Sequence, residues 1–584
     1  VNLPLAITGQ EEVWYRVYKE LGLSEQQIGE FLAGPAYLPW GWMGNIDGFG
    51  GSLTESWRKG HVELQQKILA RERALGMTPV LMGFTGHIPA SLPEKFPGIK
   101  IHRTGNWSAG FGGTVYLDPG EELFRRIGKL FIEKQTELFG TDHYYSADCF
   151  NEVNPDSDDP KAISRISHNV YRAMSEADPQ AVWVLQAWFL YYQKDFWKEP
   201  QAKAFLHAVP DDKMLVLDLW GERYPVWRTR SAFYGKPWVW NVLYNFGGRT
   251  ALHGNLKDIS ARLGEVINSH DNGKFSGIGM AMEYFGNNPV VEEFVMDHVW
   301  EKGASDPSRW IRDYVIRRYG SIHPHAEKAW QYMLRTVYNT HNQTGTFLCE
   351  RPGFYDPKLS YRSSPVPRYS QDTLAMALEE LLGCADVYHR LETYRFDLVN
   401  LTRQVLSPLA LTWIQELEKV YKEKDTVAIR KYRTLYLGLI TDMDDLLATR
   451  KEYELGRWLE SARSWGTNSD ERGICLWDAR NLITLWGGDC TEGEYDDLNN
   501  YALKQWSGMF RSYYLPRWTK FFDGLEKAVK EGKTWDRGNY YRESCKWEKS
   551  WSRGRETFPT TPKGEPIEKV KELWTKYRSY IVTR

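Results

Sequence analysis

The chain has 584 residues and a net charge of −2, with 74 basic residues balanced against 76 acidic ones. This length is enough for at least two domains, because one hydrophobic core rarely grows beyond about 250 to 300 residues. The charge balance excludes a general electrostatic attraction to nucleic acid or to anionic membranes. All apolar runs fall well short of the roughly 20 residues that span a bilayer. We therefore expect a soluble protein with no membrane span and no nucleic-acid partner.

Aromatic residues are the unusual part of the composition, since 26 Trp exceed both 24 Phe and 12 Met. The flat apolar face of tryptophan, with its single N–H donor, suits stacking on sugar rings. The composition favours a carbohydrate ligand, with structural packing as the alternative for many of these side chains. The cysteines form no C-x-x-C pair and have no histidine at ligand spacing, which argues against a zinc or redox site and leaves disulfides open. They are Cys149, Cys349, Cys384, Cys475, Cys490 and Cys545.

Short runs of apolar, β-branched and aromatic residues recur in the first half of the chain and predict buried strands. Between them lie segments with helical spacing, such as Leu123, Ile127 and Phe131 before Gly140, a natural helix end. Alternating strands and helices predict an α/β fold with a parallel sheet, and this many units predict a (β/α)8 TIM-type barrel. The seven runs are residues 1–7, 78–84, 143–150, 181–189, 213–220, 237–244 and 277–285.

The predicted barrel, residues 1–305, is one strand short of the eight that closure needs. Val1 falls directly inside a strand-like run, so we expect the first unit upstream of this sequence. Either a leader was removed or the sequence begins partway through a longer protein. The long connection 35–59 is rich in Gly and Trp, and a loop of that size after a strand is more often functional than not.

The second half of the chain has a different pattern. Between residues 369 and 515 the sole proline is Pro408, and Leu374, Leu378 and Leu381 repeat at helical spacing. Similar stripes continue further along the chain. We expect an all-α C-terminal domain over residues 306–584.

Two carboxylates stand where a predicted strand gives way to a loop. Glu152 ends the segment Asp-Cys-Phe-Asn-Glu at 148–152, and Glu283 ends Gly-Met-Ala-Met-Glu at 279–283. In a (β/α)8 barrel these strand ends form the active-site face, so the pair suggests the two carboxyl groups of a glycoside hydrolase. The adjacent Asn151 favours this interpretation, because an amide there can bind a sugar hydroxyl. The alternative is that each is an ordinary surface-loop glutamate.

Other polar and aromatic residues also follow strands or lie in long loops. His87 is placed to touch substrate or to support its loop, and Asn245 is placed to bind a hydroxyl within a glycine-containing turn. Trp40 and Trp188 are candidates for sugar stacking, with core packing as the alternative.

Three further features point to no binding site. The acidic segment 156–159 lacks the glycine and distal glutamate of a calcium loop and predicts a solvated turn. The glycine-rich segments 48–51 and 110–113 lack the Lys-Ser/Thr of a phosphate loop. Trp486 and Tyr501 lie in the helical half, where the sequence alone predicts core residues. We therefore expect no metal and no cofactor.

Motifs along nearly the whole chain, matched in order, resemble those of the α-N-acetylglucosaminidases of glycoside hydrolase family 89. So many ordered matches are highly specific. They are residues 34–41 (GPAYLPWG), 76–81 (GMTPVL), 139–143 (FGTDH), 150–152 (FNE), 215–219 (LVLDL), 245–248 (NFGG) and 513–518 (YYLPRW).

The resemblance implies a barrel followed by a helical domain that contributes to the active-site pocket. It implies an exo-acting, retaining enzyme for terminal α-linked N-acetylglucosamine, with Glu152 as acid/base and Glu283 as nucleophile. The implied glycans are of heparan or mucin type, and the implied compartment is secreted, periplasmic or extracellular in a bacterium and lysosomal in a eukaryote. The residues that it implies at the pocket are Trp40, Asn151, Trp188, Leu219, Trp486 and Tyr501.

The sequence departs from the family pattern in two places. A small N-terminal domain and a first barrel strand, whose Asn and Cys contact substrate, are not present, so we expect an incomplete pocket. Met282 and Tyr284 flank the nucleophile where other members have Pro and Gly, which puts the outer subsites in doubt. The rival activities are a barrel glycosidase for another hexosamine linkage and a non-catalytic carbohydrate-binding scaffold. A substrate-assisted β-hexosaminidase usually has an adjacent Asp-Glu pair, which Asn151-Glu152 does not supply.

Overall fold

The computed structural model describes residues 2–300, 303–359, 361, 363–487 and 498–582. The chain forms two compact units. The first unit comprises Val1–Leu243, Glu265–Ala281 and Ser464–Asp478, and the second comprises Tyr244–Gly264, Met282–Arg463 and Ala479–Arg584. Helices α11 (Leu256–Asn268) and α21 (Ser469–Leu482) contain residues of both units.

A six-stranded parallel sheet is the centre of the first unit. Its strands, in spatial order, are β1 (Val80–Met82), β5 (Tyr144–Ser146), β6 (Val182–Gln186), β7 (Met214–Asp218), β8 (Pro237–Val242) and β10 (Lys274–Met280). Leu5 adds an isolated parallel bridge to Val80, next to β1. Six of the seven predicted runs therefore contain strands of this sheet, and residues 1–7 contribute the bridge.

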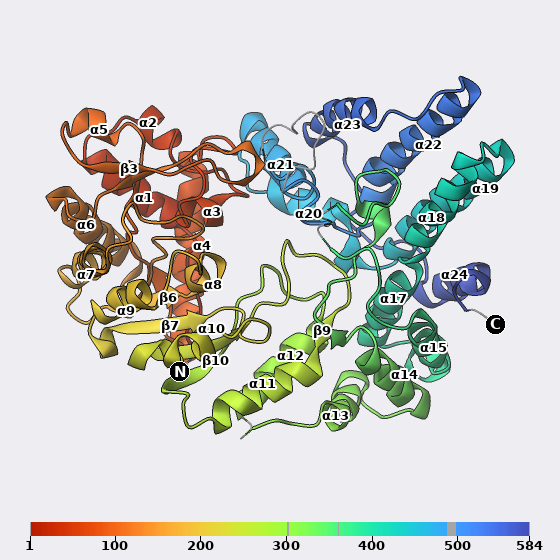
Figure 1. The fold of residues 1–584 in the computed structure, drawn as a ribbon, viewed down its shortest axis with the longest axis horizontal. Helices are drawn as coiled ribbons and strands as arrows, with labels where there is room; N and C mark the ends of the chain where they lie inside the picture. Colours follow the sequence, from red (N-terminus) through yellow and green to blue (C-terminus); the bar gives the residue numbers. More distant parts are fainter. Residues whose placement is uncertain (1, 301–302, 360, 362, 488–497, 583–584) are drawn as a thin grey trace. The chain divides into compact units, whose positions relative to one another are not determined.

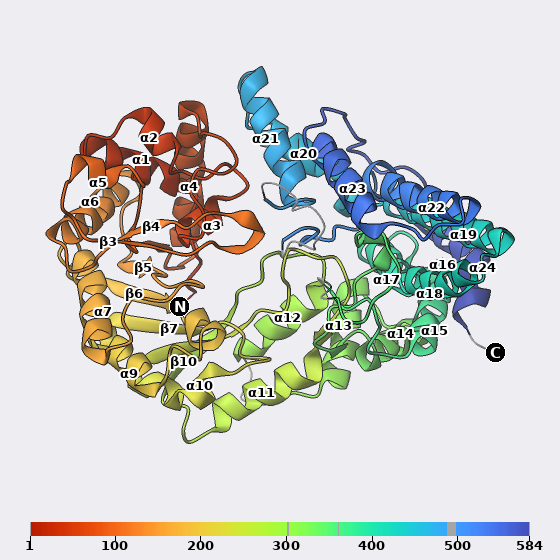
Figure 2. The same ribbon diagram turned by 45° about the horizontal axis from the view of Figure 1, so that its top comes forward.

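Helices cover the outer side of this sheet, as Figure 2 shows for α6 (Glu122–Phe139), α7 (Pro160–Ser175) and α9 (Glu199–His207). Helix α6 confirms the predicted helical stripe and ends at Gly140, whose φ of 73° suits a residue without a side chain. Neighbouring helices pack in sequence, α6 on α7 and α7 on α9. Most residues of β1, β6 and β7 are buried, so these strands read as nearly continuous apolar runs.

The remaining elements of the first unit lie mostly before β5. The strands β2 (His87–Ile88), β3 (Ile101–Arg103) and β4 (Val115–Leu117) form an antiparallel sheet in the order β2-β4-β3. The helices are α1 (Gln10–Glu20), α2 (Glu25–Gly29), α3 (Leu38–Trp42), α4 (Glu55–Ala74), α5 (Leu92–Lys95), α8 (Trp188–Tyr192) and α10 (Val226–Thr229).

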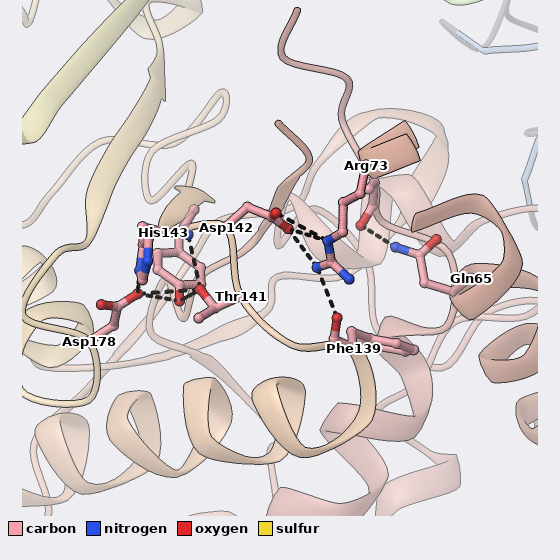
Figure 3. Close-up of polar contacts among 9 residues, drawn as sticks. Gln65, Arg73, Phe139, Thr141, Asp142, His143 and Asp178 are labelled. Carbon is pink, nitrogen blue, oxygen red and sulfur yellow. Dashed lines mark hydrogen bonds and ion pairs between the residues drawn. The ribbon is translucent and has the colours of Figure 1, made fainter. Parts of the chain in front are cut away.

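Polar contacts fix the amino-terminal end of β5 (Figure 3). The Arg73 guanidinium, at the end of α4, donates to both carboxylate oxygens of Asp142 at 2.6–3.1 Å. His143 has a left-handed φ of 68°, and its N–H donates to the Thr141 hydroxyl at 3.0 Å while its Nδ1 lies 2.7 Å from Asp178 Oδ2. In a barrel this end of the strands serves stability and not catalysis. The cluster therefore holds the strand that leads to Glu152.

The second unit is mainly helical (Figure 1), which confirms the helical pattern of the second half of the chain. Its strands β9 (Gly254–Asn255) and β11 (Asn339–Thr340) form a short antiparallel pair. The predicted stripe lies on α15, where Leu374, Leu378 and Leu381 are buried. The helices are α12 (Pro289–Asp297), α13 (Pro307–Tyr319), α14 (Pro324–Arg335), α15 (Gln371–Leu382), α16 (Ala385–Tyr388), α17 (Glu392–Leu406), α18 (Leu409–Lys422), α19 (Thr426–Leu447), α20 (Leu455–Arg463), α22 (Leu515–Lys530), α23 (Arg537–Ser552) and α24 (Pro566–Ile581).

Three sequence-based expectations concern groups spread over the whole chain. Cys149, Cys349, Cys384 and Cys475 are free and buried, Cys545 is also buried, and Cys490 lies outside the described residues. Within the described ranges, no group of His, Cys, Asp and Glu side chains could hold a metal ion. No helix in the same part of the chain is long and apolar enough to cross a membrane.

Candidate active site

Glu152 is held by two indole N–H groups of the first unit. It lies in the turn after β5, with a left-handed φ of 61°. Trp107 Nε1 donates to Glu152 Oε2 at 2.8 Å, and Nε1 of Trp188, the first residue of α8, donates to Oε1 at 3.2 Å. Each carboxyl oxygen therefore has its own donor. The sequence had marked both Glu152 and Trp188 as candidates, and in the structure a hydrogen bond joins their side chains directly.

Asn151 is fixed by Asn45, in the loop that follows α3. Its Nδ2 donates to Asn45 Oδ1 at 2.8 Å, and Asn45 Nδ2 donates back to the Asn151 carbonyl at 3.2 Å. Both side chains are buried. This reciprocal pair sets the backbone immediately before Glu152.

Asp148 is a second carboxyl group beside Glu152. Its side chain is 6% exposed, and neither of its carboxyl oxygens has a hydrogen-bond partner among the described residues. Burial, reinforced by the nearby charge of Glu152, raises the pKa of Asp148 from its ordinary 3.8 to about 7. A carboxyl of this kind keeps its proton up to neutral pH. Strongly shifted acids next to another carboxyl group are typical of catalytic sites.

An aromatic cluster continues from Trp188. The Tyr192 ring stacks on Trp188 at 5.7 Å between centroids, and the Trp220 ring lies 6.1 Å from Trp188. Tyr224 packs against Trp220 at 4.8 Å and against Tyr191 at 4.7 Å. Tyr192 and Tyr224 are exposed. Aromatic faces next to a carboxyl group suit a ligand built of sugar rings.

Leu219 and Trp40 also lie in the first unit, and both are half-buried. Leu219 directly follows β7 and precedes Trp220. The loop is anchored by buried Asp218, which accepts the N–H groups of Val226 at 3.3 Å and Trp227 at 3.1 Å. Trp40 is part of α3. Their contact with a substrate stays a prediction.

Glu283 is held in the second unit by a backbone donor and a phenol. Gly247 N–H donates to Glu283 Oε2 at 2.5 Å, and the Tyr501 hydroxyl donates to Oε1 at 3.1 Å. Gly247 has a φ of 66°, and a Cβ there would lie 2.4 Å from the Tyr501 carbonyl oxygen. Glycine is therefore required for the close approach of the two segments. Hydrogen bonds that a carboxylate accepts favour its ionised form, which is the form that can act as a nucleophile.

The other predicted residues of the second unit support this arrangement. Asn245 is fully buried, and its Nδ2 donates to the Arg249 carbonyl at 3.1 Å, closing loop 245–249. Trp486 is 2% exposed, as its sequence context predicts, and its ring meets Tyr501 edge to face at 6.3 Å between centroids. The structure thus links Trp486 to the side chain that binds Glu283. Substrate contact by Asn245 and Trp486 stays a prediction.

Two other sequence candidates have structural roles. His87 is buried in β2, and its Nε2 lies 2.5 Å from Asp47 Oδ1, so it supports the loop that follows α3. In the acidic segment, Asp159 caps α7 by accepting the Lys161 N–H at 3.2 Å. These contacts agree with the loop-support and turn alternatives.

Sequence reasoning did not single out Trp107, Asp148 or Gly247. Trp107 lies in none of the family motifs, and no local signal marks it as a site residue among the other tryptophans. Asp148 and Gly247 were inside the motifs of Glu152 and Asn245, but their roles depend on burial and on a backbone N–H. Neither property can be read from residue type.

Two protein-family models match the chain. The alpha-N-acetylglucosaminidase (NAGLU) TIM-barrel domain matches residues 1–302, and the C-terminal domain of the same family matches residues 310–576. The human protein alpha-N-acetylglucosaminidase is 34% identical over 582 residues, which are 99% of this chain and 77% of the human protein.

Solved structures give the same result. A family 89 glycoside hydrolase from Clostridium perfringens, in complex with 2-acetamido-1,2-dideoxynojirimycin, matches with a TM-score of 0.91 and 28% identity. A doubly substituted form from the same organism, in complex with its substrate GlcNAc-α-1,4-galactose, matches with a TM-score of 0.90 and 27% identity. Each match covers 100% of this chain and 66% of the bacterial chain. The chain thus spans slightly less than two thirds of these bacterial relatives.

Proposed function

This chain belongs to the α-N-acetylglucosaminidase family of glycoside hydrolases, family 89, as its motifs predicted, and from this premise we propose that it is an exo-acting, retaining glycosidase. Its substrates would be glycans of heparan or mucin type that end in α-linked N-acetylglucosamine. The bacterial relative that was solved with GlcNAc-α-1,4-galactose supports this linkage.

In the proposed first step, Glu283 attacks the anomeric carbon. A bond forms between a Glu283 oxygen and that carbon while the bond to the leaving oxygen breaks, and Glu152 gives its proton to the leaving oxygen. The product is a glycosyl ester on Glu283 and a free glycan with a new hydroxyl. The reaction uses two carboxyl groups and no cofactor.

In the proposed second step, Glu152 acts as base. It takes a proton from water, the water oxygen bonds to the anomeric carbon, and Glu283 leaves as a carboxylate. Two displacements at one carbon restore the starting configuration. Retaining enzymes place their carboxyl groups about 5 to 5.5 Å apart, which is the separation that we expect between Glu152 and Glu283.

The fixed carboxylate of Glu283 is the observation that carries this proposal. Gly247 N–H and the Tyr501 hydroxyl each bind one of its oxygens, which favours a charged and oriented nucleophile. Glu152 lies instead beside the buried Asp148 and next to the aromatic cluster of Trp188. The acid/base role that we propose for Glu152 rests on the family motif FNE at 150–152 and on its place after β5.

We also propose that residues 1–305 act as the catalytic barrel and that residues 306–584 complete the pocket. Both glutamates follow strands of one parallel sheet, Glu152 after β5 and Glu283 after β10, and the loops after such strands form the active-site face of a barrel. The proposed residues around the terminal sugar are Trp40, Asn151, Trp188, Leu219, Asn245, Trp486 and Tyr501.

One assay separates this function from its rivals. Release of nitrophenol from the α-linked nitrophenyl N-acetylglucosaminide, but not from its β-linked isomer, is expected. Activity on the β-linked compound would indicate another hexosaminidase, and no release from either would indicate a binding scaffold. Disaccharides with terminal α-linked N-acetylglucosamine on a uronate or on galactose then compare the heparan and mucin types.

Single substitutions test the two roles. Glu283→Gln should lower kcat by several orders of magnitude on every substrate, because no nucleophile remains. Glu152→Gln should strongly lower kcat for a natural disaccharide. It should slow the first step, release of the leaving group, much less for a nitrophenyl substrate, because nitrophenol leaves without a proton. Glu63→Gln, an exposed change on α4, is the matched control. Near-normal activity of Glu152→Gln on the disaccharide would contradict the assignment.

A further inference from the structure

Lys504 is a buried cation close to the proposed nucleophile. Its side chain is 5% exposed, which is unusual for a lysine. Nζ donates to the Gly248 carbonyl and lies 4.5 Å from the centroid of the Tyr284 ring. No carboxylate of the described residues lies within ion-pair distance of this ammonium group. Its burial is therefore not compensated by a direct salt bridge.

The charges that act on Lys504 are those of Glu283 and Arg249. Burial lowers the pKa of Lys504 from its ordinary 10.5 to about 7; the charge of Glu283 opposes this shift, and that of Arg249 adds to it. The Tyr284 ring faces the ammonium group, whereas the Tyr514 hydroxyl donates to the main-chain carbonyl of Lys504 at 2.9 Å. Burial raises the pKa of both phenols, so both are neutral. Among these titratable side chains, Glu283 is thus the one that favours a charged Lys504.

Lys504 also holds the loop that binds Glu283. Gly247 gives its N–H to Glu283, and the carbonyl of the next residue, Gly248, accepts from Lys504. A Cβ on Gly248 would lie 2.5 Å from Lys504 Nζ, so glycine is needed for this contact. Arg249 Nε donates to the Tyr501 carbonyl at 2.9 Å and ties the same loop to the same segment.

We propose that Lys504 is a positioning residue for the nucleophile: its ammonium group holds loop 245–249 against Glu283 and supplies a positive charge that favours the ionised carboxylate. The inference rests on the proposed function, because it assigns Glu283 as nucleophile. When Glu283 becomes a neutral glycosyl ester, Lys504 loses its opposite charge. The ammonium group therefore also favours the return of Glu283 to a carboxylate in the second step.

Three substitutions separate the charge from the hydrogen bond. Lys504→Met removes both, Lys504→Gln keeps a donor for Gly248 without the charge, and Lys504→Arg keeps both. The measurement is kcat/KM for the α-linked nitrophenyl substrate from about pH 3 to about pH 8, whose acidic limb reports the ionisation of the essential carboxylate. Thermal unfolding by circular dichroism identifies the variants that fold.

The acidic limb should move to higher pH by about one unit in the Met and Gln variants and stay in place in the Arg variant. Lys504→Gln should also recover part of the plateau activity that Lys504→Met loses. An unshifted limb in both neutral variants would mean a purely structural lysine and would overturn the inference. An active Glu283→Gln would overturn the proposed function and the inference together.

A measurement on the protein with Lys504 intact tests the inference even if the Lys504 variants do not fold. The Lys504 side chain is titrated by NMR after ¹³C labelling of lysine, in the unaltered protein and in Glu283→Gln. Loss of the Glu283 charge should move this titration to lower pH by about one unit. An unchanged titration would overturn the inference, whatever the activity of the enzyme.

Discussion

Replacement of Asp148 by asparagine should change how the stability of the protein depends on pH. Asp148 is buried in the turn after β5, and neither carboxyl oxygen has a hydrogen-bond partner among the described residues. Burial, and to a smaller degree the charge of Glu152, raises its pKa from 3.8 to about 7. Asparagine has nearly the same shape and does not titrate in this range.

The sign of the effect follows from the raised pKa. Between pH 3.8 and about 7, the folded protein keeps a proton on Asp148 that the unfolded chain has lost. The stability from this group is therefore fully present below pH 3.8 and is lost as pH rises to about 7. At 1.36 kcal/mol per pH unit, the loss is about 4 kcal/mol.

The assay is urea unfolding followed by tryptophan fluorescence, for the wild type and for Asp148→Asn, at several values from about pH 4 to about pH 8. The difference between the two free energies of unfolding should change by about 4 kcal/mol over this range, in favour of Asn at high pH. The cost of burying the amide is independent of pH and cancels in this comparison. Asp195→Asn, an exposed change in the same unit, should show no such trend.

The charge of Glu152 should also affect the pH dependence of stability. Glu152→Gln removes the charge that reinforces burial, so the pH range over which the wild type loses stability should become narrower. A difference between wild type and Asp148→Asn that stays constant, within about 0.5 kcal/mol, from pH 4 to pH 8 would refute the shifted pKa.

Three further substitutions address the contacts of the two glutamates. Tyr501→Phe removes the hydroxyl that donates to Glu283, and kcat/KM should fall about ten- to hundredfold with little change in melting temperature, as expected for a lost hydrogen bond to a charged group. Gly247→Ala should lower kcat further than Tyr501→Phe, because its Cβ would lie 2.4 Å from the Tyr501 carbonyl and displace the N–H donor; equal kinetics of the two variants would contradict this. Trp107→Phe removes a 2.8 Å hydrogen bond to Glu152 and should lower kcat about tenfold for a disaccharide but less for the nitrophenyl substrate, so an equal loss on both would exclude a role in proton transfer.

Local sequence patterns were sufficient to predict the fold class. A buried strand appears in the sequence as a short apolar run, and a helix with one buried face appears as apolar residues at helical spacing. Leu123, Ile127 and Phe131 lie on the buried face of α6, and six of the seven apolar runs contain strands of the parallel sheet. The predicted ends of the strands were less accurate. Residues 277–285 were expected to form a strand, whereas β10 ends at Met280, and the apolar residues Tyr284 and Phe285 beyond it are exposed.

The two glutamates could be selected from the sequence, since each follows a strand and the surrounding motifs match one family. Their chemical environments could not. Tyr501 is 218 residues from Glu283, and Trp107 is 45 residues from Glu152, so no local sequence pattern predicts either hydrogen bond. The burial of Asp148 and Lys504, which shifts the pKa of both, likewise arises from segments that meet only in the folded chain. Residue types and periods are local properties, whereas hydrogen-bond geometry and desolvation depend on every neighbour in space.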